Sequence, residues 1–229
     1  MYKGKKILAF IPARSGSKRL KDKNIQKINN ISLFEYSVNV AKKSKYIDEI
    51  IVSSDSIDIL NRAHQLGCYK NELRPAWLSN DDSRIVDAII FEVDKNNLND
   101  YNAVVLLQPT SPNRTKELLD GAIEKYFETE TSLITVANTK ENPIFLRTIK
   151  DGKLKKVVSS SSDIRSQELE KTYKIVGNIY INNLKTLDTN TILNENEIPY
   201  LIDDMYDIDI DDKEDLELAK EIMNKSRCL

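Results

Sequence analysis

Histidine and cysteine are scarce in this chain, which has one histidine and two cysteines among 229 residues. His64 lies in a segment with helical periodicity beside Ala63 and Leu66, where a packing or surface role is expected, so Ser-His-Asp catalysis is disfavoured. Cys68 and Cys228 are far apart in the sequence. Since 40% of the residues are hydrophobic, the core needs no disulfide to stabilise it.

Other features that are lacking narrow the class of protein further. No apolar run approaches the roughly 18 residues of a membrane-spanning helix, and no signal-peptide pattern is present. We therefore expect a cytoplasmic protein without a membrane partner. The chain contains 34 basic and 36 acidic residues. Nucleic-acid binding through general electrostatics needs a positive excess, so no nucleic-acid partner is expected. The glycine-lysine signature of P-loop kinases is also absent.

Short apolar runs alternate with helical patterns through the first 137 residues. This alternation predicts an α/β fold with a mainly parallel, Rossmann-like sheet and helices on both faces. The predicted strands are 7–11, 50–53, 103–107 and 133–136, followed by a return strand at 178–181. Helices are predicted from a capping box at Ser32 and Glu35, after Ser56, over 85–98 and 115–127, and from Asp212.

We interpret the chain, 1–229, as one large α/β domain that carries a smaller lobe. The segment 139–172 is polar and contains a hairpin-like turn at 150–153. It is predicted to protrude from the domain. Dimer contact is one use for such a lobe, and a plain surface excursion is the alternative.

A basic loop follows the first predicted strand. Five of its ten residues, 14–23, are cations and only one is acidic. Its tip, Ser15, Gly16 and Ser17, is small enough for the backbone to approach a ligand closely. Backbone N–H groups and flexible cations at a strand end suit a polyphosphate, although a solvated basic turn would have the same composition.

Acidic and apolar residues alternate near the end of the chain, where Asp207, Asp209 and Asp211 flank Ile208 and Ile210. On an extended strand this period of two would place the carboxylates on one face and the isoleucines in the core. Adjacent carboxylates suit Mg²⁺ or Mn²⁺, with substrate phosphates completing the coordination. The alternative is an acidic strand edge that faces water. A phosphate loop and a metal-binding segment together indicate nucleotidyl transfer.

Polar groups also follow the third predicted strand, where Gln108, Thr110 and Ser111 lie in a turn fixed by two prolines. Amide and hydroxyl groups of this kind can orient a polyhydroxylated sugar. Arg74 is suited to a base carbonyl or a phosphate oxygen. Arg14, Ser54-Asp55 and the groups from Gln108 to Ser111 all follow predicted strand ends. Since ligands of parallel α/β sheets bind beyond the carboxyl ends of the strands, they should converge on one crevice.

In this order, the segments resemble the acylneuraminate cytidylyltransferases (CMP-sialic acid synthetases) and their relatives that act on other nine-carbon ulosonic acids. The resemblance spans almost the whole chain. It rests on Ile11-Pro-Ala-Arg-Ser-Gly-Ser-Lys18, Lys23-Asn24, Arg74-Pro-Ala76, Leu107-Gln-Pro-Thr-Ser-Pro112, Gly177-Asn-Ile-Tyr180, Asp209-Ile-Asp211 and Asp215-Leu216.

The resemblance implies a CTP-dependent enzyme that forms a homodimer and releases pyrophosphate. Residues implied to bind the nucleotide are Arg14, Ser15, Gly16, Ser17, Lys18, Lys23, Asn24 and Arg74. Those implied to bind the sugar acid are Gln108, Thr110, Ser111, Arg165 and Tyr180. Asp209 and Asp211 would hold the catalytic Mg²⁺, which Mn²⁺ could replace, and they would act together with Arg14 and Lys18.

Three positions depart from the family pattern: Val176 stands where asparagine is frequent, Lys174 where an arginine can occur, and Ile85 where a serine can contribute to the nucleotide pocket. Three other functions remain open at this point. They are a cytidylyltransferase for the eight-carbon acid Kdo, a metal-dependent glycosyltransferase, and a non-catalytic nucleotide-binding module.

Overall fold

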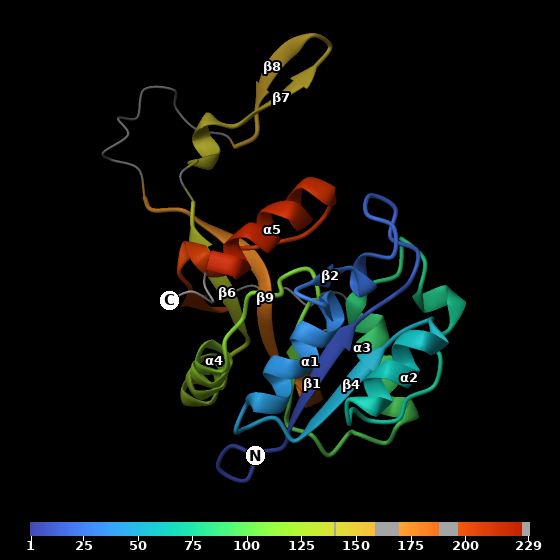
Figure 1. The fold of residues 1–229 in the computed structure, drawn as a ribbon. Coiled ribbons are helices and arrows are strands. Elements are labelled where there is room, and N and C mark those ends of the chain that lie inside the picture. Colours follow the sequence, from blue (N-terminus) through green and yellow to red (C-terminus); the bar gives the residue numbers. More distant parts are fainter. Residues whose placement is uncertain (140, 159–169, 188–196, 226–229) are drawn as a thin grey trace.

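The computed structural model describes residues 1–139, 141–158, 170–187 and 197–225. At its centre is a six-stranded sheet in the spatial order β10-β6-β9-β5-β1-β4 (Figure 1). β9 runs antiparallel to β5 and β6, and the other pairs are parallel. These strands are β1 Ile7–Pro12, β4 Glu49–Ser53, β5 Ala103–Leu106, β6 Leu133–Asn138, β9 Tyr173–Asn183 and β10 Ile198–Leu201.

Helices cover both faces of the sheet, as the alternating pattern predicted. Ile7, Ala9 and Ile11 of β1 belong to one apolar cluster with α1, α2 and α4, whereas Leu8 and Phe10 belong to a second cluster with α3. Successive side chains of a strand point to opposite faces, so β1 is buried from both sides. The helices are α1 Leu33–Lys43, α2 Ile57–Gln65, α3 Ile85–Lys95, α4 Lys116–Thr129 and α5 Lys213–Lys225.

The helix starts predicted from capping residues are confirmed. The Glu35 carboxylate accepts hydrogen bonds from the Ser32 N–H and hydroxyl, both at 2.8 Å, which forms the capping box of α1. Thr115 caps α4, and Asp212 accepts from two backbone N–H groups in the first turn of α5. The return strand extends well beyond the predicted 178–181, because β9 pairs along most of its length with neighbours on both sides.

The polar segment contains the predicted hairpin, formed by β7 (Arg147–Lys150) and β8 (Lys153–Lys156). Its turn residues, Asp151 and Gly152, both have positive φ, as a two-residue hairpin turn of type I′ requires. Figure 1 shows this hairpin standing away from the sheet, beyond α5. Dimer contact through it stays a prediction. A second short hairpin pairs β2 (Lys27–Ile28) with β3 (Ile31–Ser32).

α5 closes the same end of the molecule. Its buried residues Leu216, Ala219 and Met223 pack with Ile208 and Ile210, so the isoleucines are in the core as expected. Residues 207–211 form no strand, however, which corrects that part of the prediction. Instead of joining the sheet, this segment donates a 2.8 Å backbone hydrogen bond from Ile210 to the carbonyl of Thr110.

None of the helices in the described ranges has the length and apolar character needed to cross a membrane. Cys68 is buried as a free thiol, and burial raises its pKa to about 11, which makes it unreactive. Cys228 lies outside the described residues.

Candidate active site

A cleft of about 590 Å³ lies beyond the carboxyl ends of β1 and β5. It brings together residues from both ends of the chain, because the basic loop and the late aspartates line the same space. The expected site residues that line it are Arg14, Ser17, Lys18, Lys23, Asn24, Arg74, Gln108, Thr110, Asp209 and Asp211.

The remaining expected residues in the described part of the chain, Ser15, Gly16, Ser111 and Tyr180, do not line this cleft. Ser15 and Gly16 belong to the loop that forms its wall, and Arg165 lies outside the described residues. Ser111 and Tyr180 are buried behind it. Burial, together with the charge of Asp209, raises the pKa of Tyr180 to about 12, so its hydroxyl stays protonated.

The end of β4 holds the basic loop in place. The Asp55 carboxylate accepts hydrogen bonds from the Ser15 N–H at 2.6 Å and from its hydroxyl at 2.8 Å. The Ser54 hydroxyl donates to the Ala13 carbonyl at 2.7 Å. Asn24 donates its amide to the Arg14 carbonyl, also at 2.7 Å. Asn24 therefore shapes the loop in this structure.

The loop cations are paired with carboxylates across the cleft. Asp81 binds Arg14 at 2.9 Å and also binds Lys18. The Asp81 hydrogen bond and charge raise the pKa of Lys18 above its ordinary value. Lys18 is therefore protonated near neutral pH and is held by an internal anion.

Asp211 makes the equivalent pairs at the other wall. It binds Lys23 at 3.0 Å and Arg19 at 2.8 Å. Burial tends to raise the pKa of Asp211, but the hydrogen bond from Lys23 and the charges of both cations outweigh burial and hold it below the ordinary value. Asp211 is therefore ionised, and in this structure its two carboxylate oxygens are paired with Arg19 and Lys23.

Arg74 is only 6% exposed, yet it lines the cleft. Its Nε and one terminal nitrogen have no hydrogen-bond partner among the described residues. Burial lowers the pKa of Arg74, and the charges of Asp55 and of the buried Glu92 oppose this effect. Unpaired donors on a buried guanidinium are costly, so this geometry fits a ligand that offers adjacent acceptor atoms.

Arg114 is a buried residue behind the site that the sequence analysis missed. It is 8% exposed and donates to the Asn178 carbonyl at 2.6 Å, to the Ser37 hydroxyl at 2.9 Å and to the Gln108 carbonyl. Burial lowers its pKa to about 9. Arg114 thereby ties the turn after β5 to β9 and α1. Its position between a proline turn and a helix cap carries no local signal of burial.

Gly177 lets the Gln108 side chain lie directly against the backbone of β9. A Cβ atom at Gly177 would be 2.3 Å from Gln108 Oε1 and 3.5 Å from Ser111 Oγ. Any side chain at this position would therefore displace Gln108 from the cleft wall.

The acidic segment offers two carboxylates to the cleft, those of Asp209 and Asp211. Asp207 does not line it and pairs with Lys174 instead. In the described part of the chain, no group of three or more histidine, cysteine or acidic side chains could hold a metal ion. Two carboxylates beside a basic loop fit Mg²⁺, which usually takes one or two carboxylates plus substrate phosphates and water.

Comparison with known proteins identifies the family. The sequence matches the cytidylyltransferase family over residues 8–226. The chain belongs to this family. It is 34% identical to a CMP-N,N'-diacetyllegionaminic acid synthase of Legionella pneumophila, over 95% of this chain and 96% of that protein. It is 30% identical to a pseudaminic acid cytidylyltransferase of Campylobacter jejuni, over 94% and 95% of the two chains.

A longer relative, the N-acylneuraminate cytidylyltransferase of Escherichia coli, is 31% identical over 96% of this chain and 52% of its own length. Among solved structures, the fold is similar to that of CMP:2-keto-3-deoxy-manno-octonic acid synthetase complexed with CTP. That match has a TM-score of 0.72 and 16% identity, and it covers 96% and 99% of the two chains. At this identity the likeness shows the fold alone.

The three departures from the cytidylyltransferase pattern have different surroundings. Val176 is buried with Ala137 and Ile202, so it packs in the apolar layer of β6 and β9. Lys174 pairs with Asp207 outside the cleft. Ile85, at the start of α3, does line the cleft and is therefore the departure that faces the nucleotide-sized space.

Asp55→Ala should weaken CTP binding about tenfold, because it removes both acceptors of Ser15 and one charge that offsets buried Arg74. Isothermal titration calorimetry with CTP measures the effect. Asp58→Ala removes an exposed aspartate in the first turn of α2; it is the matched control and should leave CTP binding unchanged. Equal losses in the two variants would contradict a specific role for Asp55.

Proposed function

We propose that this cytidylyltransferase activates a nine-carbon 2-keto sugar acid of the sialic acid type. It transfers CMP from CTP to the anomeric hydroxyl and releases pyrophosphate. The observation that carries the proposal is the single cleft in which the basic loop faces Asp209 and Asp211. The names of the relatives, which include synthases for diacetyllegionaminic, pseudaminic and N-acylneuraminic acids, support this substrate class.

Arg14, Lys18 and Lys23 would bind the triphosphate and offset its charge as the α-phosphorus is attacked in line. Arg74 would bind the cytosine. Its two unpaired N–H groups match the adjacent acceptors O2 and N3 of cytosine, whereas uracil carries a hydrogen on N3 and would oppose one donor. Recognition through buried donors of this kind discriminates strongly against a base that leaves one unpaired.

Asp209 and Asp211 would hold Mg²⁺, with Mn²⁺ as a possible replacement. When bound, this ion offsets phosphate charge and lowers the pKa of the attacking hydroxyl. Lys23 and Arg19 hold the pKa of Asp211 below its ordinary value, and they would release its oxygens to the ion when it binds. Ser17 and Asn24 complete the loop wall on the nucleotide side.

Gln108 and Thr110 would orient the sugar acid at the mouth of the cleft. Arg114 fixes the backbone of Gln108, and Gly177 leaves room for its amide. Ser111 and Tyr180 would support this wall from behind, because both are buried. Arg165 is proposed to bind the sugar carboxylate on the strength of the family resemblance.

The hairpin β7–β8 is proposed to contact a second copy of the chain. Ile149 is 78% exposed and Leu154 is 70% exposed, and they pair directly across the hairpin. Phe145 adds a third large apolar side chain, 60% exposed, at the base. Apolar groups gathered on one protruding element are typical of interaction surfaces.

We also propose a cytoplasmic location, which fits the use of CTP.

The proposal is tested by incubating the protein with CTP, Mg²⁺ and a panel of sialic, legionaminic, pseudaminic and Kdo acids. Pyrophosphate release that depends on a nine-carbon acid, with formation of the CMP-sugar, is the expected result. Turnover with Kdo alone would identify the eight-carbon alternative. Transfer from a finished nucleotide sugar, without pyrophosphate release, would identify a glycosyltransferase.

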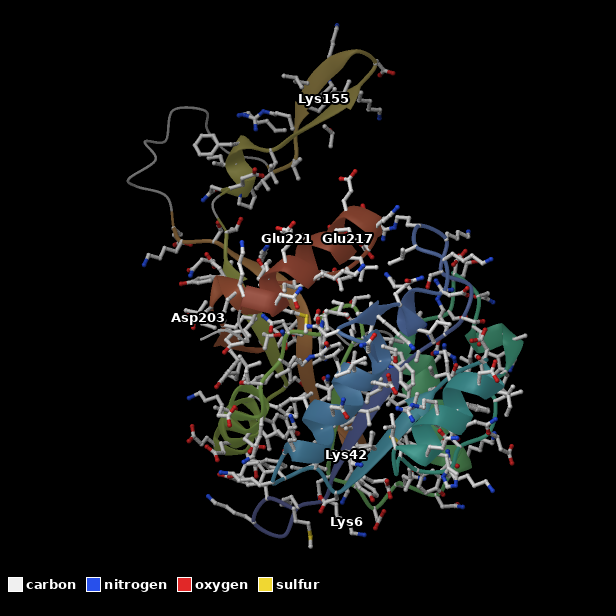
Figure 2. The ribbon with its side chains drawn as sticks, in the orientation of Figure 1. Lys6, Lys42, Lys155, Asp203, Glu217 and Glu221 are labelled. Carbon is white, nitrogen blue, oxygen red and sulfur yellow. The ribbon has the colours of Figure 1, made fainter. Side chains whose placement is uncertain are left out.

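Asp209→Ala should lower turnover about 100-fold or more while leaving the fold intact, because it removes one of two proposed metal ligands. The rate of pyrophosphate release and the circular dichroism spectrum are the measurements. Asp203→Ala removes an exposed carboxylate that does not line the cleft (Figure 2) and should retain activity. An active Asp209→Ala enzyme would refute the metal assignment.

Replacing Ile149 and Leu154 together by glutamate should convert a dimer into a monomer, since two charges would enter an apolar contact. Light scattering after size exclusion measures the mass, expected to fall from twice 26.3 kDa to 26.3 kDa. Thr148→Glu, on the other face of the hairpin, should leave the dimer intact. A monomeric parent protein would refute the proposed contact.

A further inference from the structure

Asp81 is an acidic residue inside a site that would bind a polyanion. It lines the cleft and uses both carboxylate oxygens on the loop cations, Oδ1 on Arg14 and Oδ2 on Lys18. These two cations are also those that the proposed function assigns to the triphosphate. In this structure Asp81 therefore occupies two of the five loop cations.

A polyphosphate cannot engage Arg14 and Lys18 fully while Asp81 holds them. The carboxylate would otherwise remain beside the phosphates as an additional negative charge, which is unfavourable. Exchange is inexpensive, because the pair is open to solvent: the Asp81 side chain is 44% exposed and that of Lys18 is 79% exposed. Exposed ion pairs contribute little to stability and break readily.

The backbone that carries Asp81 is held independently of this ion pair. The Ser79 hydroxyl donates to the Pro75 carbonyl at 3.1 Å. The Ser83 hydroxyl donates to the Trp77 carbonyl at 2.8 Å. The Asp81 side chain can consequently release the cations without unfolding its segment, and it remains in position to bind them again.

We propose that Asp81 is an exchangeable counter-ion of the phosphate loop. Its ion pairs with Arg14 and Lys18 break when a polyphosphate binds and form again when pyrophosphate leaves. The role in product release rests on the proposed function, since pyrophosphate is the product of that reaction. Asp81 thus lowers the affinity of the site for CTP and for pyrophosphate, and it limits product inhibition.

Asp81→Asn removes the charge but keeps an oxygen that can accept from Lys18 or Arg14. Calorimetry at low salt should show that CTP and inorganic pyrophosphate each bind about two- to fivefold more tightly to this variant. Cytidine, which has no phosphate, should bind as it does to the parent protein. The gain should shrink at high salt, because the charges involved are exposed.

Asp82→Asn is the matched control, since it removes the same charge from the neighbouring exposed residue, which does not line the cleft. It should raise pyrophosphate affinity by less than Asp81→Asn does, because the Asp82 charge acts on Lys18 from a greater distance and without a hydrogen bond, and Asp81→Glu should restore parental affinity. Weaker or unchanged pyrophosphate binding in Asp81→Asn would overturn the proposal, as would an equal gain for cytidine or in Asp82→Asn. Turnover of CTP by the parent protein tests the proposed function separately, whatever these affinities are.

Discussion

The ion pair between Lys23 and Asp211 joins residues that are 188 positions apart in the sequence, with 3.0 Å between Nζ and Oδ1. It connects the loop after the first strand to the segment before the last helix. Five cations in one short loop would repel one another without facing carboxylates. Asp211 and Asp81 supply those carboxylates, and each of them binds two cations. The cleft depends on this balance of charge.

The rest of the fold keeps these charged groups in place. The parallel strands β1, β4 and β5 end at one edge of the sheet, so the segments that follow them meet there. Asp55 fixes the tip of the loop, and buried Arg114 fixes the turn that carries Gln108. Ile210 is fully buried and anchors the two aspartates that flank it. Apolar packing thus holds the acidic wall, while hydrogen bonds hold the basic one.

Much of this arrangement could be predicted from local sequence. The apolar runs predicted four strands, the capping box at Ser32 predicted the start of α1, and Asp151-Gly152 predicted a hairpin. Alternation of strands and helices also predicted that Arg14 and the groups from Gln108 to Ser111 would face one crevice, because parallel strands end together. The signal for each strand, helix start and turn lies within a few residues.

What the sequence could not predict depends on distant partners. The insertion of β9 between β5 and β6 depends on pairing between segments that are far apart. Residues 207–211 alternate like a strand, but their backbone meets the turn at Thr110 and their isoleucines meet α5, so no sheet forms. Arg114 and Asp81 look like ordinary surface charges in the sequence. The partners that the fold brings to them decide their roles: Arg114 becomes a buried residue that links three elements, and Asp81 becomes a counter-ion.

The central claim is that one nucleotide bridges the cationic loop and the paired aspartates with a divalent ion between them. A crystal structure of the protein grown with CTP and Mn²⁺, with anomalous scattering recorded for manganese, tests this claim most directly. We predict one manganese peak bound to Asp209 and Asp211, and triphosphate oxygens that contact both that ion and Lys23. A nucleotide bound away from the aspartates, or manganese bound elsewhere, would contradict it.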